Sequence, residues 1–260
     1  MKRFLIWPAV MVLLGQPLSG ASDLPYQTDF PPEEFQGRWN VLFDKIGDHA
    51  IAIVQGAPKA NGFLLPRQTN EFYHLCGIET PHAYLILDGR DRRVTLVLPP
   101  RDARLESAEG KIISADDAEL VKRLTGAQAV ASTTSMTEEW MRQLIGGSTT
   151  AIYTPFAPAE GNAQSRGELR AANNAILRDP WDGRPAREAH LVELLKARFQ
   201  KVEVRDLTPI LDELRSVKSP REIALIRRAS QLAGWGLIAA IKNTRPGAFE
   251  YQLDAVARYV

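Results

Sequence analysis

Apolar and polar positions follow helical spacing in some stretches of the chain and strand-like spacing in others. Four apolar residues recur at helical spacing after a double proline: Phe35, Trp39, Leu42 and Ile46. Residues 50–54 form a short apolar run that ends before a glycine, which is typical of a buried strand. Residues 83–87 and 94–98 are two more apolar runs, and the Asp88-Gly89 pair between them predicts a β-hairpin.

Predicted helices and strands alternate through the middle of the chain. We expect helices over residues 70–76, 116–126, 136–146 and 187–200. We expect strands over residues 127–132, 149–154 and 201–207. Residues 155–184 are polar and irregular apart from a helical pattern at 166–178, so they predict an excursion over the surface. This alternation predicts α/β layers with helices on both faces of a mixed sheet.

The stretch "LRSVKSPREIALIRRA" predicts an unusually definite helix start. Ser219 can cap the helix, Pro220 suits its first position, and Glu222 can reach back in a capping box. The apolar stripe that follows is Ile223, Ile226, Ala229 or Ser230, Ala233 and Leu237. The segment 206–219 before it is the best candidate for a domain boundary.

Charge excludes some partners. Lys and Arg number 32 against 31 Asp and Glu, and no basic stripe is present, so neither nucleic acid nor an anionic membrane surface is expected as a partner.

The N-terminus predicts an exported protein. Lys2 and Arg3 precede an apolar run over residues 4–14, and Ser19 and Ala21 suit the positions before a cleavage site. The alternatives are a membrane anchor and a buried helix, but the run is well short of the roughly twenty residues that span a bilayer, and Pro8 interrupts it. We therefore predict a signal peptide over residues 1–21, a periplasmic or secreted location, and no membrane contact after cleavage.

The usual catalytic motifs are missing from the sequence. It contains no H-E-x-x-H, Walker A or G-x-S-x-G motif and no cysteine pair. Four scattered histidines have no evident partner ligands and are expected at the surface or in hydrogen bonds: His49, His74, His82 and His190. Cys76 is expected to be a small buried apolar residue. The acidic pairs 116–117 and 138–139 suit the first turns of helices. We thus expect no catalytic or metal-binding residue in this chain, and the sequence leaves any substrate-binding residues unknown.

Four stretches, taken in order, carry a resemblance to a known family. In "LLPRQTNEFYHLCGIETPHAYLIL" the matching positions are Arg67, Asn70, Phe72, Tyr73, Leu75, Gly77 and Pro81. "VTLVLPPRD", "LRSVKSPREIALIRRAS" and "RPGAFEYQLDA" follow. Together they resemble the N-terminal domain of the Xaa-Pro aminopeptidases (aminopeptidase P), its junction with the pita-bread domain of the creatinase–prolidase family, and the helix start after that junction. Of the Trp-x-Gly-x-Arg element that this family often has, only Gly110 is present.

The resemblance implies both a fold and an activity. We expect a three-layer α/β creatinase/aminopeptidase P-type domain with a mixed sheet over residues 22–213. The first helices of a pita-bread metallopeptidase domain follow over residues 214–260. The family removes the N-terminal residue before proline from peptides, and works as a homo-oligomer. It uses two divalent metal ions, usually manganese, held by two Asp, one His and two Glu of the pita-bread domain.

The end of the chain leads to a further expectation. The last residue, Val260, comes before any of those ligands, and Phe249, Leu253 and Val256 form an apolar stripe that needs a partner surface. We therefore expect a truncated pita-bread domain and a fragment that is inactive and poorly soluble alone. Two alternatives stay open: a non-catalytic binding or assembly module of the same architecture, and a creatinase-type metal-independent hydrolase.

Overall fold

Six strands form one mixed sheet in the order β4-β3-β2-β1-β5-β6. The computed structural model describes residues 26–60, 67–161 and 164–260, so the predicted signal peptide over residues 1–21 lies outside the described residues. The strands are β1 (Ala50–Gln55), β2 (Tyr84–Asp88), β3 (Arg93–Leu98), β4 (Ala129–Ser132), β5 (Ala151–Thr154) and β6 (Glu203–Asp206). β2 pairs antiparallel with β1 and β3, and the other pairings within this sheet are parallel.

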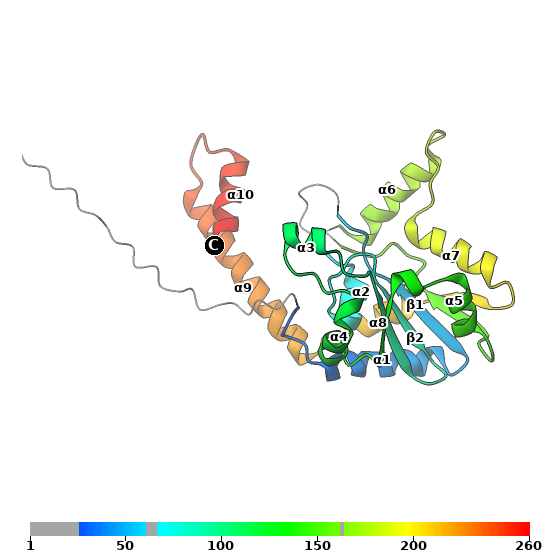
Figure 1. Ribbon diagram of the computed structural model, residues 1–260. Helices are drawn as coiled ribbons and strands as arrows, with labels where there is room; N and C mark the ends of the chain where they lie inside the picture. Colours follow the sequence, from blue (N-terminus) through cyan, green and yellow to red (C-terminus); the bar gives the residue numbers. More distant parts are fainter. Residues whose placement is uncertain (1–25, 61–66, 162–163) are drawn as a thin grey trace, which may run out of the picture.

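Helices cover both faces of the sheet (Figure 1). One face carries α1 (Pro32–Ile46), α2 (Asn70–Cys76), α4 (Ala118–Thr125) and α8 (Thr208–Ser216). The other face carries α5 (Glu138–Ile145) and α7 (Arg187–Arg198). Trp39 and Leu211 belong to the core on the first face, and Met141 and Leu195 to the core on the second. The predicted three-layer α/β fold with a mixed sheet is confirmed.

Strand β1 is apolar on both sides because it lies inside the sheet and between both helix layers. Successive side chains of a strand point to opposite faces. Ala50, Ala52 and Val54 accordingly join the core under α1, whereas Ile51 and Ile53 join the core under α7. This accounts for the unbroken apolar run in the sequence.

The predicted hairpin between β2 and β3 is confirmed, and its turn requires a glycine. Gly89 lies so close to the preceding loop that a Cβ atom there would stand 2.0 Å from the carbonyl oxygen of Gly47 and 2.9 Å from that of Ala50. Any side chain at this position would therefore displace backbone.

Two helices have no counterpart among the predicted elements. Helix α3 (Ala103–Glu109) is capped by Asp102 and buries none of its residues, so it leaves no apolar pattern in the sequence. Helix α8 occupies the segment interpreted as a domain boundary, but it packs Leu211 into the core of the sheet domain. The structure thus places α8 with the sheet.

Helices α9 (Pro220–Asn243) and α10 (Glu250–Tyr259) extend away from the sheet on one side of the molecule, and α6 (Arg166–Arg178) lies on the other side (Figure 1). α10 folds back on α9, where the backbone of Ala257 approaches Gly236. Much of the two predicted apolar stripes is exposed: Leu237 in α9 is 62% accessible, and Phe249 at the start of α10 is 63% accessible.

Helix α6 buries no residue, which confirms the predicted surface excursion. Among the described helices, none combines the length and the apolar character that a membrane span requires.

Candidate functional site

The crevice where open α/β sheets commonly bind ligands is closed in this chain. Such a crevice lies where the strand order reverses, at the carboxyl ends of the strands. Here the reversal falls between β1 and β5, because β2, β3 and β4 extend to one side of β1 and β5 and β6 to the other. The ends of β1 and β5 enclose only about 10 Å³, beside Val54, Thr154 and Glu188. Glu188 accepts the backbone N–H of Ala159 at 3.2 Å across this gap. The crevice is therefore filled by protein.

The start of helix α9 is a more elaborate site. The Ser219 hydroxyl accepts the backbone N–H of Glu222 at 3.2 Å, and Glu222 Oε2 accepts the backbone N–H of Ser219 at 2.7 Å, which confirms the predicted capping box. The other oxygen, Oε1, lies 3.1 Å from His74 Nδ1 on α2 and 3.4 Å from Arg38 Nη2 on α1. One carboxylate therefore starts α9 and also joins it to two helices of the sheet domain. We name Arg38, His74 and Glu222 the junction cluster.

His74 is a neutral member of this cluster. Burial lowers its pKa from 6.5 to about 3, and the positive charges of Arg38, Arg215 and Lys218 act in the same direction. A neutral imidazole that faces a carboxylate oxygen through Nδ1 carries its hydrogen there and donates it. Its Nε2 is buried and has no hydrogen-bond partner among the described residues. At neutral pH His74 is thus an uncharged hydrogen-bond donor that helps to fix the Glu222 carboxylate in place.

Arg38 supplies the positive charge of the junction cluster. Its side chain is 8% exposed and also lies 3.2 Å from Glu34 Oε1, one turn earlier on α1. It donates to the carbonyl of His74 and lies over the ring of Phe30, with its guanidinium carbon 4.9 Å from the ring centre. Burial lowers the pKa of Arg38, and two carboxylates oppose that shift. These contacts fix the guanidinium where α9 begins.

A second buried carboxylate, Glu71 on α2, joins α6 and α8 to the sheet domain. Its side chain is 4% exposed, and Oε1 lies 3.3 Å from Arg166 on α6 and 3.1 Å from Arg215 on α8. Arg166 also contacts both carboxylate oxygens of Asp212, at 2.6 and 2.8 Å. Burial raises the pKa of Glu71 although the two arginines act against it. The position of α8, which leads into α9, therefore depends on buried charges as well as on apolar packing.

A cavity of about 330 Å³ lies between these charged groups and the first turns of α9. Arg38, Arg215 and Lys218 line it together with a single carboxylate, that of Glu222, so positive charge is in excess. Its described lining includes no serine, threonine or cysteine that could act as a nucleophile. The arrangement can orient α9 and can hold a polar group.

The four histidines lie on separate parts of the fold. His49 is loosely paired with Asp48 at 3.8 Å, His82 Nε2 accepts the backbone N–H of Lys59 at 3.1 Å, and His190 lies in the first turn of α7. Only His74 joins the junction cluster. The expectation that Cys76 is a buried apolar residue is confirmed: it is 0% exposed, and burial raises the pKa of its thiol to about 12.

Acidic residues do not converge on a metal site in the described part of the chain. Within residues 26–60, 67–161 and 164–260, no group of three or more His, Cys, Asp or Glu side chains could hold a metal ion. The acidic pairs lie in first turns as predicted: Asp116 and Asp117 in a 3₁₀ turn before α4, and Glu138 and Glu139 in α5.

The sequence alone does not identify the junction cluster as a site. Glu222 was interpreted only as a capping residue, and neither His74 nor Arg38 belongs to a motif that marks a buried ionic contact. The available signal was the position of Glu222 in the first turn of a helix that starts at a proposed domain boundary.

Known proteins resemble the chain in sequence and in fold. The sequence model of the family described as "Aminopeptidase P, N-terminal domain" matches residues 35–153. The Xaa-Pro aminopeptidase of Haemophilus influenzae is 25% identical over 90% of this chain and 48% of that protein. The Xaa-Pro aminopeptidase of Escherichia coli K12 is 26% identical over 85% of this chain and 47% of that protein.

The likeness extends to a solved structure, that of aminopeptidase P from E. coli in a low-pH form. It superposes with a TM-score of 0.65 at 23% identity, covering 89% of this chain and 49% of that chain. At this identity the structural likeness is one of fold. The chain spans about half the length of the relatives it matches.

Proposed function

Because this chain carries the N-terminal portion of the Xaa-Pro aminopeptidase family, we propose that the whole protein removes the N-terminal residue from peptides whose second residue is proline. The X-Pro bond is a tertiary amide that lacks an N–H, so a peptidase needs a site shaped for the proline ring. The observation that carries the proposal is the match of residues 35–153 together with relatives of the same name over most of the chain.

In this proposal the sheet domain over residues 22–213 is the N-terminal domain, and residues 214–260 begin the catalytic domain. The junction cluster supports this division, because Glu222 starts α9 while it contacts α1 and α2. The exposed apolar side chains of α9 and α10, among them Trp235 and Ile241, also suit helices that pack against further protein. The role of the described residues would then be to set the orientation of the catalytic domain.

The family resemblance further suggests two divalent ions, which we propose to be manganese; such ions activate water for attack on a peptide carbonyl. The described residues do not fit that group, since no cluster of three metal-ligating side chains occurs among them. They therefore provide no metal-dependent catalytic step, and we propose that the 260-residue chain is inactive alone.

We also propose that residues 1–21 direct export, that the protein is periplasmic or secreted, and that it assembles into a homo-oligomer.

A peptidase assay tests the proposal in two arms. The 260-residue chain and the polypeptide encoded by the complete reading frame are each incubated with Mn²⁺ and a tripeptide that has proline second. We expect the complete polypeptide to release the first amino acid, and EDTA to stop the release. A matched tripeptide with alanine second should react much more slowly.

Other results would overturn the proposal in distinguishable ways. Metal-dependent release by the 260-residue chain would place the site within it. A folded complete polypeptide that releases nothing would favour the non-catalytic module. Hydrolysis of creatine that persists in EDTA, without peptide cleavage, would favour the creatinase-type enzyme.

A further inference from the structure

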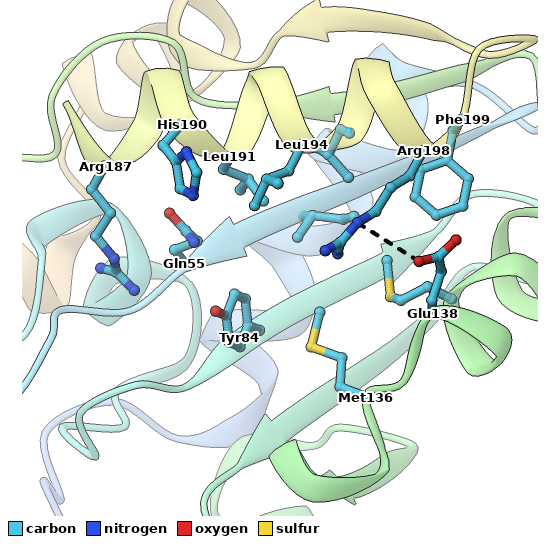
Figure 2. A pocket seen from close by; sticks show the side chains of 13 residues that line it. Gln55, Tyr84, Met136, Glu138, Arg187, His190, Leu191, Leu194, Arg198 and Phe199 are labelled. Atoms are coloured by element: carbon cyan, nitrogen blue, oxygen red, sulfur yellow. Dashed lines mark ion pairs between the residues drawn. The ribbon is translucent and has the colours of Figure 1, made fainter. Parts of the chain in front are cut away.

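A cavity far from the junction cluster lies between α7 and the sheet (Figure 2). It encloses about 380 Å³, which is within the range of small-molecule sites. β1 and β2 form its floor, α7 covers it, and residues at the start of α5 close one side. We name this cavity the α7 pocket.

Four polar side chains gather at one end of the α7 pocket (Figure 2). Gln55 and Tyr84 are directly opposed in the β1–β2 register, so their side chains stand on the same face of the sheet. Arg187 and His190 come from the first turn of α7 above them. Arg187 donates to the carbonyl of Gly56, and this bond holds the guanidinium in place while it uses only part of its five N–H donors.

The rest of the α7 pocket is apolar. Its side chains include Met136, Met141, Leu191, Leu194 and Phe199. At the far end Arg198 lies 3.9 Å from Glu138, so these two charges balance each other. The pocket therefore combines an apolar body with a polar end that has a single cationic side chain.

Charge at the polar end selects the ligand class. Among the described residues that line this end, none is acidic. Arg187 carries a permanent positive charge, and the N-terminus of α7 adds a positive partial charge to it. A guanidinium pairs well with a carboxylate, because its planar N–H groups match the two oxygens. The Gln55 amide and the Tyr84 hydroxyl can add neutral hydrogen bonds to the same group.

We propose that the α7 pocket binds a small amphipathic carboxylate. The carboxylate lies against Arg187 between Gln55 and Tyr84, and the apolar part lies along Leu191 and Leu194. The single cation matches a monoanion better than a doubly charged phosphate ester. This site does not rest on the proposed peptidase activity, because no residue of α9 or α10 lines it.

Octanoate and octanol form a matched pair of probes, because they share a chain length and differ in the charged group. Isothermal titration of the 260-residue protein should give a Kd for octanoate on the order of 0.1–1 mM, as expected for about ten non-hydrogen atoms. Octanol should bind at least about tenfold more weakly.

Three variants locate the binding. Arg187→Gln should weaken octanoate about tenfold and leave octanol unchanged. Leu194→Trp fills the cavity from α7 and should abolish the binding of both probes. Arg184→Gln is the matched control, because Arg184 stands three residues earlier, pairs with Asp182 and does not line the pocket. It should change nothing, and far-UV circular dichroism checks the fold of each variant.

Several results would overturn the proposal. If octanoate and octanol bind equally, no carboxylate is recognised. If neither Arg187→Gln nor Leu194→Trp weakens octanoate, the probe binds elsewhere, for example on the exposed apolar faces of α9 and α10. If Arg187→Gln fails to fold, Leu194→Trp decides alone, because it keeps the contact between Arg187 and Gly56.

Discussion

Replacing Glu222 with alanine is expected to loosen helix α9 from the sheet domain. The change removes one half of a capping box, and caps contribute about 1 kcal/mol. It also leaves the buried Arg38 with Glu34, at 3.2 Å, as its remaining carboxylate. Breaking a buried ion pair from one side costs about 3–5 kcal/mol, and a retained second carboxylate should reduce this to roughly 1–2 kcal/mol. We therefore expect a total loss of about 2–3 kcal/mol in the free energy that holds α9 in place.

Two matched variants separate these contributions. Glu222→Gln can still close the capping box but has no charge, so we expect it to cost about 1–2 kcal/mol. Glu213→Ala removes an exposed carboxylate, 67% accessible, that lies 3.0 Å from Lys45. Pairs this exposed contribute little, and we expect a loss below about 0.5 kcal/mol.

Hydrogen exchange of the α9 backbone amides measures the opening of this helix directly. A loss of 2–3 kcal/mol corresponds to about 30- to 150-fold faster exchange in the first turns of α9. Urea unfolding of the whole chain shows whether the sheet domain is affected too. The reasoning is refuted if Glu222→Ala speeds exchange in α9 no more than Glu213→Ala does.

Acidification and two glycine substitutions test other features of the fold. Unfolded His74 takes up a proton near pH 6.5, but the folded chain does so only near pH 3. Stability contributed by neutral His74 is thus complete above pH 6.5 and falls by up to about 1.4 kcal/mol per pH unit below it. In urea unfolding, His74→Asn should flatten this slope and exposed His49→Asn should not; equal slopes in both variants would contradict the burial argument. In thermal unfolding, Gly89→Ala should lower the free energy of unfolding by more than about 3 kcal/mol, because its Cβ atom would clash with backbone. Gly37→Ala should raise it by about 0.5–1 kcal/mol, because Gly37 lies in helix α1 with open space around it. Similar effects at the two positions would contradict the packing argument.

The strands and most helices were predictable because each leaves a local pattern. The apolar run over residues 50–54 became β1, and the turn chemistry of Asp88-Gly89 became the β2–β3 hairpin. Helix α3 could not be found in this way, because it is short and buries none of its residues. Its start depends on the Asp102 side chain, and a single cap is a weak signal without an apolar stripe behind it.

The sites were less predictable because they depend on contacts between distant segments. The sequence indicated that Glu222 closes a capping box, but it carried no sign that the second oxygen of this carboxylate meets His74 and Arg38. The burial of His74 follows from where α2 and α9 pack, which no local pattern specifies. The α7 pocket combines residue types that are ordinary one by one, such as Gln55 and Tyr84, and becomes visible only when strand register and helix position are known.

The position of β5 beside β1 has a consequence for how the chain reaches its fold. Ala50 pairs with Ala151, so about 100 residues must be synthesised before this edge of β1 acquires its partner. The β1–β2 and β2–β3 pairings join near neighbours in sequence and can form first, since short loops close at lower entropic cost. At about 5–20 residues per second, the edge of β1 stays open for roughly 5–20 s on the ribosome. During that interval the unpaired backbone from Ala50 to Ala52 is the segment most exposed to wrong strand pairing, and a holding chaperone would be most useful there.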